Sequence, residues 1–304
     1  QAVGGELVGA NAGLVEEGIA ADVLEEGTDL SLYGKQTRPL PKLLEYATEA
    51  PIPGISNDQA GATRFLEGLG LDLKADGDWR TWADLSDDER QTVASGLVQR
   101  AVERGVPADK IETLIGTTYT LTAEPRGTEL RDASEFSTLL NATARYERAD
   151  VGLAVCLGER DAPLERARTL LSNHRRNLSE GLTLVKERGV TQAGTVQWFD
   201  AGDAIRETIV GIVAGMALGT DGVDSDKPII AFASTDEDET KVSSRATGPL
   251  VGRGVDLSVV MREAAQSVGG DGGGHDIAAG ATIPTGEESA FIEAADEIIS
   301  EQLS

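Results

Sequence analysis

Residues 269–284 read Gly-Gly-Asp-Gly-Gly-Gly-His-Asp-Ile-Ala-Ala-Gly-Ala-Thr-Ile-Pro. Glycine lets the backbone adopt positive φ angles and lets a ligand come close to the main chain. Successive N–H groups in such a turn can converge on an anion, and the His275 imidazole can donate a hydrogen bond to a phosphate oxygen. Residues 277–283 have the pattern of a short strand that would hold this loop on a sheet. A flexible surface loop followed by an edge strand would give the same pattern.

Strand and helix patterns alternate through the last third of the chain, as expected for an α/β fold. The expected strands span residues 194–199, 228–233, 240–246 and 277–283, and the helices between them span residues 205–216 and 256–268. A closing helix presents Phe291, Ala295, Ile298 and Ile299 on its inner side. The sequence therefore predicts a mixed sheet with flanking helices. On the first helix, Gly211 and Gly215 would allow a neighbouring element to come close.

The clearest helical pattern runs from residue 161 to residue 188. Pro163 suits a first turn, and apolar residues recur at spacings of three and four. His174 lies on this apolar stripe. No Cys, His or carboxylate lies four residues away on the stripe to complete a metal site. We therefore expect a packed histidine with one hydrogen-bonded nitrogen, on a helix that connects two domains.

The pattern before residue 111 is less regular. It gives a strand at residues 30–33 and a helix at residues 40–48, followed by a proline and glycine cluster that marks a boundary. Helical spacing with short breaks over residues 56–110 predicts a small helical insertion. Trp79 and Trp82 flank a turn in this insertion. The pair is compatible with a small packed core or with a surface for a partner.

Mixed structure is expected again between residues 111 and 160. One helix there carries Asn141 and Arg145, which lie four residues apart and would project from the same side. They would either face a bound strand or remain solvated. Residues 151–157 have the pattern of an apolar strand. Cys156, the single cysteine of the chain, is expected to be a buried core thiol.

The chain carries 52 acidic and 27 basic residues, for a net charge of −25. Its hydrophobic content of 40% excludes the composition of a disordered chain. The charge predicts the salt-adapted surface of a halophilic organism, although an acidic mesophilic protein would have the same composition. Near 1 M salt the Debye length is about 3 Å, so the net charge does not exclude binding to a nucleic acid. No membrane span or signal peptide is apparent, which predicts a cytoplasmic protein.

Two motifs in the last third carry a resemblance to a known family. Residues 241–247 read Lys-Val-Ser-Ser-Arg-Ala-Thr, and the Gly-Gly-Gly-His-Asp-Ile-Ala-Ala-Gly motif follows about thirty residues later. Together they resemble the DHH-associated substrate-binding domain of DHH-family phosphoesterases. The resemblance is strongest to the archaeal RecJ-like single-strand nucleases, including the type that associates with the GINS complex.

This resemblance implies a division of the chain into five parts, of which the first would be the end of a longer catalytic domain. Because the chain begins at Gln1 and lacks the motifs of that domain, we expect it to be the C-terminal part of a longer protein. The expected parts are the C-terminal remnant of a DHH catalytic domain (1–55), a helical insertion (56–110), a return to the core with an interdomain segment (111–160), a connector helix (161–190) and the DHH-associated domain (191–304).

The resemblance also implies a substrate site. Arg245 would hold a phosphate or a base with its fork of donors, although an ion pair with a nearby carboxylate is the plain alternative. The other residues expected to contact the substrate are Ser243, Ser244, Gly272, Gly273, Gly274 and His275, with Asn141 and Arg145 from the earlier helix.

DHH enzymes use divalent metals, Mn²⁺ or Mg²⁺, held by Asp-rich motifs and by the Asp-His-His signature. None of these motifs occurs in this sequence, whose only histidines are His174 and His275. We therefore expect no metal ligand and no catalytic residue in the chain, and no cleavage by the chain alone. The resemblance further implies that residues 56–110 contact a partner, the GINS replication complex.

The resemblance favours one function and leaves two alternatives. The favoured function is the substrate-binding part of a metal-dependent RecJ-like exonuclease for single-stranded DNA or RNA. The second is a phosphodiesterase for short oligonucleotides, cyclic dinucleotides or adenosine bisphosphate. The third is a non-catalytic binding module of a replication complex. The sequence leaves the choice of DNA or RNA, the polarity of digestion and the oligomeric state open.

Overall fold

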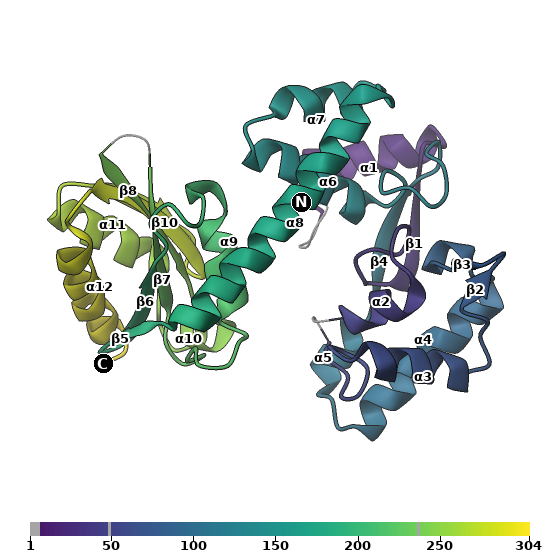
Figure 1. Ribbon diagram of the computed structural model, residues 1–304, viewed down its shortest axis with the longest axis horizontal. Helices are drawn as coiled ribbons and strands as arrows, with labels where there is room; N and C mark the ends of the chain where they lie inside the picture. The colour runs from purple at the N-terminus through teal and green to yellow at the C-terminus, as the bar shows by residue number, and fades with distance from the viewer. Residues whose placement is uncertain (1–6, 48–49, 236–237) are drawn as a thin grey trace. The chain divides into compact units, whose positions relative to one another are not determined.

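The computed structural model describes residues 7–47, 50–235 and 238–304 of the chain (Figure 1). It consists of two compact units, Gln1–Asn141 and Ala142–Ser304. Each unit has its own buried core, and each is considered by itself below.

The first unit is built on a two-stranded antiparallel ribbon in which Leu24 lies opposite Leu121. The ribbon consists of β1 (Leu24–Leu30) and β4 (Ile115–Leu121). The expected strand at residues 30–33 was placed too late in the chain, because pairing with β4 ends at Leu30. The other elements are α1 (Ala10–Ala20), α2 (Leu40–Glu45), α3 (Gln59–Gly68), the hairpin β2–β3 (Lys74–Ala75 and Asp78–Trp79), the 3₁₀-helix η1 (Trp82–Asp84), α4 (Asp87–Glu103) and α5 (Ala108–Glu112). Thr48, the expected end of the helix that became α2, lies outside the described residues.

The two tryptophans of this unit have different environments. Trp82 is buried, and its Nε1 donates to both carboxylate oxygens of Asp29, at 3.2 and 3.0 Å. Trp79 is 45% exposed on the β2–β3 hairpin. Trp82 is therefore part of the core, and Trp79 is accessible to another molecule.

Helix α4, which follows the tryptophans in the chain, begins with a capping box, in which Ser86 and Glu89 bind each other's backbone N–H groups.

Helix α6 (Ala133–Arg145) spans the boundary between the units, and α7 (Ala149–Cys156) and α8 (Ala162–Arg188) follow. The prediction of a strand at residues 151–157 was wrong, because a short apolar run cannot be assigned to strand or helix by periodicity alone. As a helix, α7 buries Val151 and Val155 and leaves Cys156 exposed, so the predicted core thiol was also wrong.

Helix α8 agrees closely with the predicted helix. His174 is buried on its apolar stripe, with its ring edge-to-face against Tyr146. The expected hydrogen bond is not made at Nδ1, which has no partner among the described residues. Burial lowers the pKa of His174, as do the nearby charges of Arg145 and Arg175.

The second unit contains a six-stranded mixed sheet in the order β5-β6-β7-β8-β10-β9. Strands β6 and β7 are parallel, and every other neighbouring pair is antiparallel. The predicted mixed α/β fold is thereby confirmed. The strands are β5 (Thr191–Ala193), β6 (Val196–Asp200), β7 (Ile229–Ser234), β8 (Glu239–Arg245), β9 (Asp271–Gly274) and β10 (Ala278–Pro284).

Helices cover the two faces of this sheet differently (Figure 1). Helix α9 (Glu207–Ala217) packs on β7 and β8. Helices α11 (Leu257–Ser267) and α12 (Glu288–Gln302) pack on the opposite face, where α11 covers β9 and β10. The short α10 (Gly248–Gly252) precedes α11. Side chains alternate between the faces along each strand, so the α9 face of β8 is separate from the core under α11.

Among the residues that the structure describes, no helix combines the length and the apolar composition that a membrane span requires.

Candidate functional site

A cation-lined hollow lies on the α9 face of the sheet in the second unit. Its volume is about 320 Å³. The residues that line it are Arg145, Glu207, Thr208, Gly211, Ile212, Lys241, Ser243 and Arg245. Three of these eight side chains are cationic and one is acidic, in a chain whose net charge is −25. We call this hollow the cation pocket.

Arg245 is the last residue of β8, and its side chain lies along α9. Its Nη1 donates to the carbonyl of Ser244 at 2.7 Å. A Cβ on Gly211 would come within 2.8 Å of Nη2 of Arg245 and 2.9 Å of Oγ of Ser243. A Cβ on Gly215 would lie 3.6 Å from the Arg245 side chain, which is ordinary contact. The close approach predicted for the two glycines is confirmed, and Gly211 is the position that requires it.

Positive charge accumulates in the cation pocket, where three of the lining residues are cationic. Burial lowers the pKa of Arg245, and the neighbouring charge of Arg145 lowers it further. Within the described residues, no carboxylate lies within ion-pair distance of Arg145, Lys241 or Arg245. The alternative in which Arg245 pairs with a carboxylate is therefore not observed. An anion bound among these groups would relieve their mutual repulsion.

The hydroxyl groups of Thr208 and Ser243 and the first turn of α9 complete the cation pocket. Arg145 reaches it from the end of α6 and donates through Nη1 to the carbonyl of Thr208 at 3.0 Å. The Thr208 hydroxyl is buried and has no partner among the described residues. Glu207 and Thr208 lie in the first turn of α9, where unpaired N–H groups favour an anion.

The strand register connects the cation pocket to the glycine motif. Ser243 on β8 lies opposite Gly280 on β10, and Gly280 lies opposite Gly273 on β9. These residues share the α9 face of the sheet, and their row spans about 10 Å. A Cβ added to Gly273 would meet no atom within 4 Å. The sheet therefore continues from the cation pocket to Gly273 as a floor without large side chains.

The other two glycines of the motif have roles inside the fold. A Cβ on Gly272 would come within 2.5 Å of the Met261 carbonyl on α11, so this glycine allows β9 to pack on the helix. Gly274 has a φ of 148°, and a Cβ there would lie 2.6 Å from Cα of Ala279. The glycine run thus serves strand packing at Gly272 and Gly274 and leaves Gly273 on the open face.

His275 lies at the turn between β9 and β10. Its backbone N–H donates to the Ala278 carbonyl at 2.9 Å, and its side chain is exposed. Ala278 lies opposite Arg245, so the turn and Arg245 are at the same end of the sheet, with β10 between them. His275 is not among the residues that line the cation pocket.

Two further predicted site residues, Ser244 and Asn141, do not line the cation pocket. Five of the residues that line it were not predicted as site residues: Glu207, Thr208, Gly211, Ile212 and Lys241. Ser244 is completely buried on the α11 face, where its hydroxyl donates to the Ala279 carbonyl at 3.2 Å. Asn141 is exposed on α6 and does not line the cation pocket. Lys241 was missed, although the two-residue period of a strand places it on the same face as Ser243 and Arg245.

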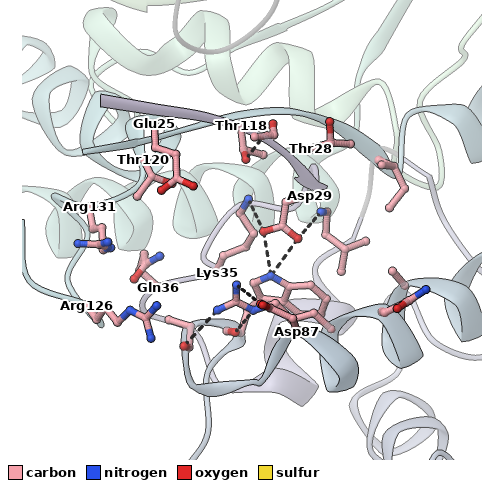
Figure 2. A pocket seen from close by; sticks show the side chains of 18 residues that line it. Glu25, Thr28, Asp29, Lys35, Gln36, Asp87, Thr118, Thr120, Arg126 and Arg131 are labelled. Carbon is pink, nitrogen blue, oxygen red and sulfur yellow. Dashed lines mark hydrogen bonds and ion pairs between the residues drawn. The ribbon is translucent and has the colours of Figure 1, made fainter. Parts of the chain in front are cut away.

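A second hollow, of about 520 Å³, lies in the first unit between the β1–β4 ribbon and α4 (Figure 2). Its charged side chains are largely paired internally. Asp29 accepts hydrogen bonds from Lys35 at 3.3 Å and from Trp82, as Figure 2 shows. Arg90 donates to two backbone carbonyls, and so does Arg131. None of the predicted site residues lines this hollow, and its internal pairing leaves the cation pocket as the better anion site.

The second unit is an α/β domain that concentrates positive charge on one face of its sheet, as domains that bind anionic ligands do. Residues 192–301 match the model of the DHHA1 domain, and residues 32–115 match the model of the DHH-CID domain. The two matches support a protein of the DHH family.

Individual relatives were compared with the chain in sequence and in fold. The chain is 28% identical to an uncharacterised protein of Methanocaldococcus jannaschii, MJ0831, over 98% of this chain and 60% of the relative. CDC45 from Entamoeba histolytica has a similar fold, with a TM-score of 0.55 and 10% identity over 91% of this chain and 58% of that chain. RecJ from Thermus thermophilus, in complex with Mg²⁺, gives a TM-score of 0.44 and 17% identity over 73% of this chain and 32% of that chain. The chain thus spans about three fifths of the length of MJ0831.

Proposed function

We propose that this chain is the substrate-binding part of a DHH-family phosphoesterase, a RecJ-like exonuclease that hydrolyses single-stranded DNA or RNA with divalent metal ions. The observation that carries the proposal is the cation pocket, which Arg145, Lys241 and Arg245 line without an ion pair to any carboxylate in the described part of the chain. A phosphate of the strand supplies the missing negative charge, and the planar guanidinium groups suit its oxygens.

The open face of the sheet gives the strand a path beyond the cation pocket. From Ser243 the row of small residues leads to Gly273, where the backbone is accessible. His275 is exposed in the turn two residues after Gly273 and can donate to a phosphate oxygen. Glycines in the floor allow the sugar-phosphate backbone to lie close to the sheet.

The described residues bind and orient the substrate in this proposal. In the described ranges, no three His, Cys, Asp or Glu side chains come together in a group that could hold a metal ion. The residues present therefore do not fit a metal centre, and we assign no step of the hydrolysis to a metal held by them. Their part is to neutralise a phosphate with the three cations and to fix its position on the sheet.

A smaller substrate is the main alternative. The cation pocket, at about 320 Å³, is at the lower end of the range for small-molecule sites, roughly 300–1,000 Å³. It therefore has room for one nucleotide unit, which a short oligonucleotide or a cyclic dinucleotide would also provide. The open floor toward Gly273 favours a longer strand.

Residues 56–110 are proposed to contact a partner, the GINS replication complex. The observation that favours a contact is Trp79, which is 45% exposed and forms a wall of two hollows of about 500 and 540 Å³. Exposed tryptophans of this kind are frequent among the residues that dominate binding energy at protein interfaces.

The substrate site is tested by measuring the affinity of the full-length protein for end-labelled single strands, with a chelator present to prevent cleavage. We expect Arg245→Ala to weaken binding roughly tenfold or more and Arg245→Lys to restore only part of it, because lysine lacks the planar fork. His275→Ala is expected to weaken binding severalfold. Arg262→Ala is the matched control, because it removes the same charge from α11 on the opposite face. Equal losses for Arg245→Ala and Arg262→Ala would contradict the proposed site.

A further inference from the structure

Among the described residues that line the cation pocket, Glu207 is the acidic one. It is the first residue of α9, and it is exposed. No ion pair joins it to Arg145, Lys241 or Arg245 among the described residues, although all four side chains line the same hollow. The Glu207 carboxylate therefore does not neutralise any of the three cations through an ion pair.

A free carboxylate at a phosphate site has a cost, because it repels the ligand that the cations attract. An ionised carboxylate only accepts hydrogen bonds. A bound nucleotide offers a donor beside its phosphate in the form of a sugar hydroxyl. In nucleic acids this donor is the ribose 2′-OH or a free 3′-OH at the end of a strand.

We propose that Glu207 accepts a hydrogen bond from a sugar hydroxyl of the nucleotide whose phosphate lies among Arg145, Lys241 and Arg245. The proposal rests on the proposed function, and it makes Glu207 the residue that distinguishes sugars at this site. The volume of the cation pocket, about 320 Å³, has room for one phosphate together with its sugar. Deoxyribose within a strand has no free hydroxyl, so a DNA phosphate meets only the repulsion of the carboxylate.

A purely structural role would give a different result. An acidic residue in the first turn of a helix is stabilised by the helix dipole and affects the stability of the helix. Such a role would change the affinity for RNA and DNA equally, through the population of folded protein. The ratio of the two affinities therefore separates sugar recognition from helix stabilisation.

The test uses fluorescence anisotropy of the full-length protein with single strands of one base sequence, in chelator. The strands are RNA and DNA, each with a 3′-hydroxyl or a 3′-phosphate. We expect the wild-type protein to prefer the strand with the sugar hydroxyl roughly tenfold, the effect of one hydrogen bond to a charged group. If the 2′-OH is the donor, the preference follows the sugar. If the terminal 3′-OH is the donor, the preference follows the end group.

Three variants decide the role of Glu207. Glu207→Ala removes the acceptor, and we expect it to reduce the preference to about onefold while DNA binds up to about threefold tighter. Glu207→Gln keeps a neutral acceptor and should retain part of the preference. Glu263→Gln on α11 removes an acid from the opposite face and should change nothing.

Two outcomes overturn the inference, and a third concerns the proposed function instead. A wild-type protein without a preference, or a preference that survives in Glu207→Ala, excludes Glu207 as the sugar acceptor. If Lys241→Ala and Arg245→Ala leave the affinity for every strand unchanged, the phosphate site is absent. If those two variants weaken binding and Glu207→Ala leaves the ratio intact, the proposed function stands and only this inference fails.

Discussion

Arg245 shows how a single residue depends on its neighbours. Its backbone ends a central strand, its Nη1 is fixed on the Ser244 carbonyl, and its guanidinium lies on a helix that has a glycine where any other residue would collide with it. Burial and the charge of Arg145 both disfavour its protonated form, as the lowered pKa records. The residue is thus held in a position that becomes favourable when an anion binds.

A matched pair of glycine substitutions tests this positioning. Gly211→Ala places a Cβ within 2.8 Å of the Arg245 guanidinium, so the side chain must move. We expect the affinity for single strands to fall by about fivefold to thirtyfold, or roughly 1–2 kcal/mol. Gly215→Ala makes only ordinary contact at 3.6 Å and should change the affinity less than about twofold.

Thermal unfolding provides the control for both glycine variants. Alanine is favoured over glycine in a helix by about 1 kcal/mol, so neither variant is expected to unfold the protein. Equal affinities for Gly211→Ala and Gly215→Ala, with both proteins folded, would show that the position of Arg245 does not matter for binding.

At the scale of elements, the helix α8 and the hairpin β2–β3 show what patterns can and cannot specify. Regular apolar spacing over 27 residues is compatible with a single helix that has a single buried face, so α8 was predicted almost to its ends. In the run at residues 151–157 every residue is small or apolar, and only packing decides that it forms α7. The hairpin presents one tryptophan outward while η1, directly after it, buries the other.

The two tryptophans give a prediction that separates folding from partner binding. Trp82→Ala should lower the free energy of unfolding by about 3–5 kcal/mol, because it empties a core position and leaves Asp29 without its indole donor. Trp79→Ala should lower it by less than about 1 kcal/mol, since the residue is 45% exposed on the surface and does not belong to the buried core. Urea unfolding measures both changes.

The same pair tests the contact with the GINS complex. We expect Trp79→Ala to weaken its binding to the full-length protein by at least about tenfold while the fold stays intact. Unchanged affinity for Trp79→Ala would exclude the β2–β3 hairpin as the contact.

For the whole molecule, the distribution of charge matters more than its sum. A net charge of −25 repels a nucleic acid at long range, whereas the three cations of the cation pocket attract it at short range. Acidic residues outnumber basic ones in the chain, yet among the described residues that line the cation pocket only Glu207 is acidic. This contrast makes the dependence of binding on salt a diagnostic measurement.

We expect a shallow salt dependence of binding. Three phosphate contacts on a single strand give a slope of log affinity against log salt concentration of about −2, at roughly −0.7 for each contact. Lys241→Ala should reduce the magnitude of the slope by about 0.7, and Lys227→Ala, outside the cation pocket, should leave it unchanged. Affinities measured at four or five salt concentrations give both slopes. A Lys241→Ala slope equal to that of the wild-type protein would remove Lys241 from the phosphate site.

The sequence by itself determined the elements whose patterns are long or strongly periodic. These include α8 and the alternation of strands and helices after residue 190, because their apolar residues recur at helical or strand spacing. It also singled out Gly211 and Gly215 as a place of close approach. These features depend on residues near one another in the chain.

Only the tertiary structure decided which of these residues share a site. The order β8-β10-β9 puts Gly273 on the floor that begins at Ser243, and the packing of α11 on the opposite face buries Ser244. Arg145 lies at the end of α6 and Glu207 at the start of α9. The packing of α9 on β8 brings both residues to the hollow that Lys241 and Arg245 also line. Such contacts depend on strand order and helix packing between distant segments, and no local pattern of residues encodes them.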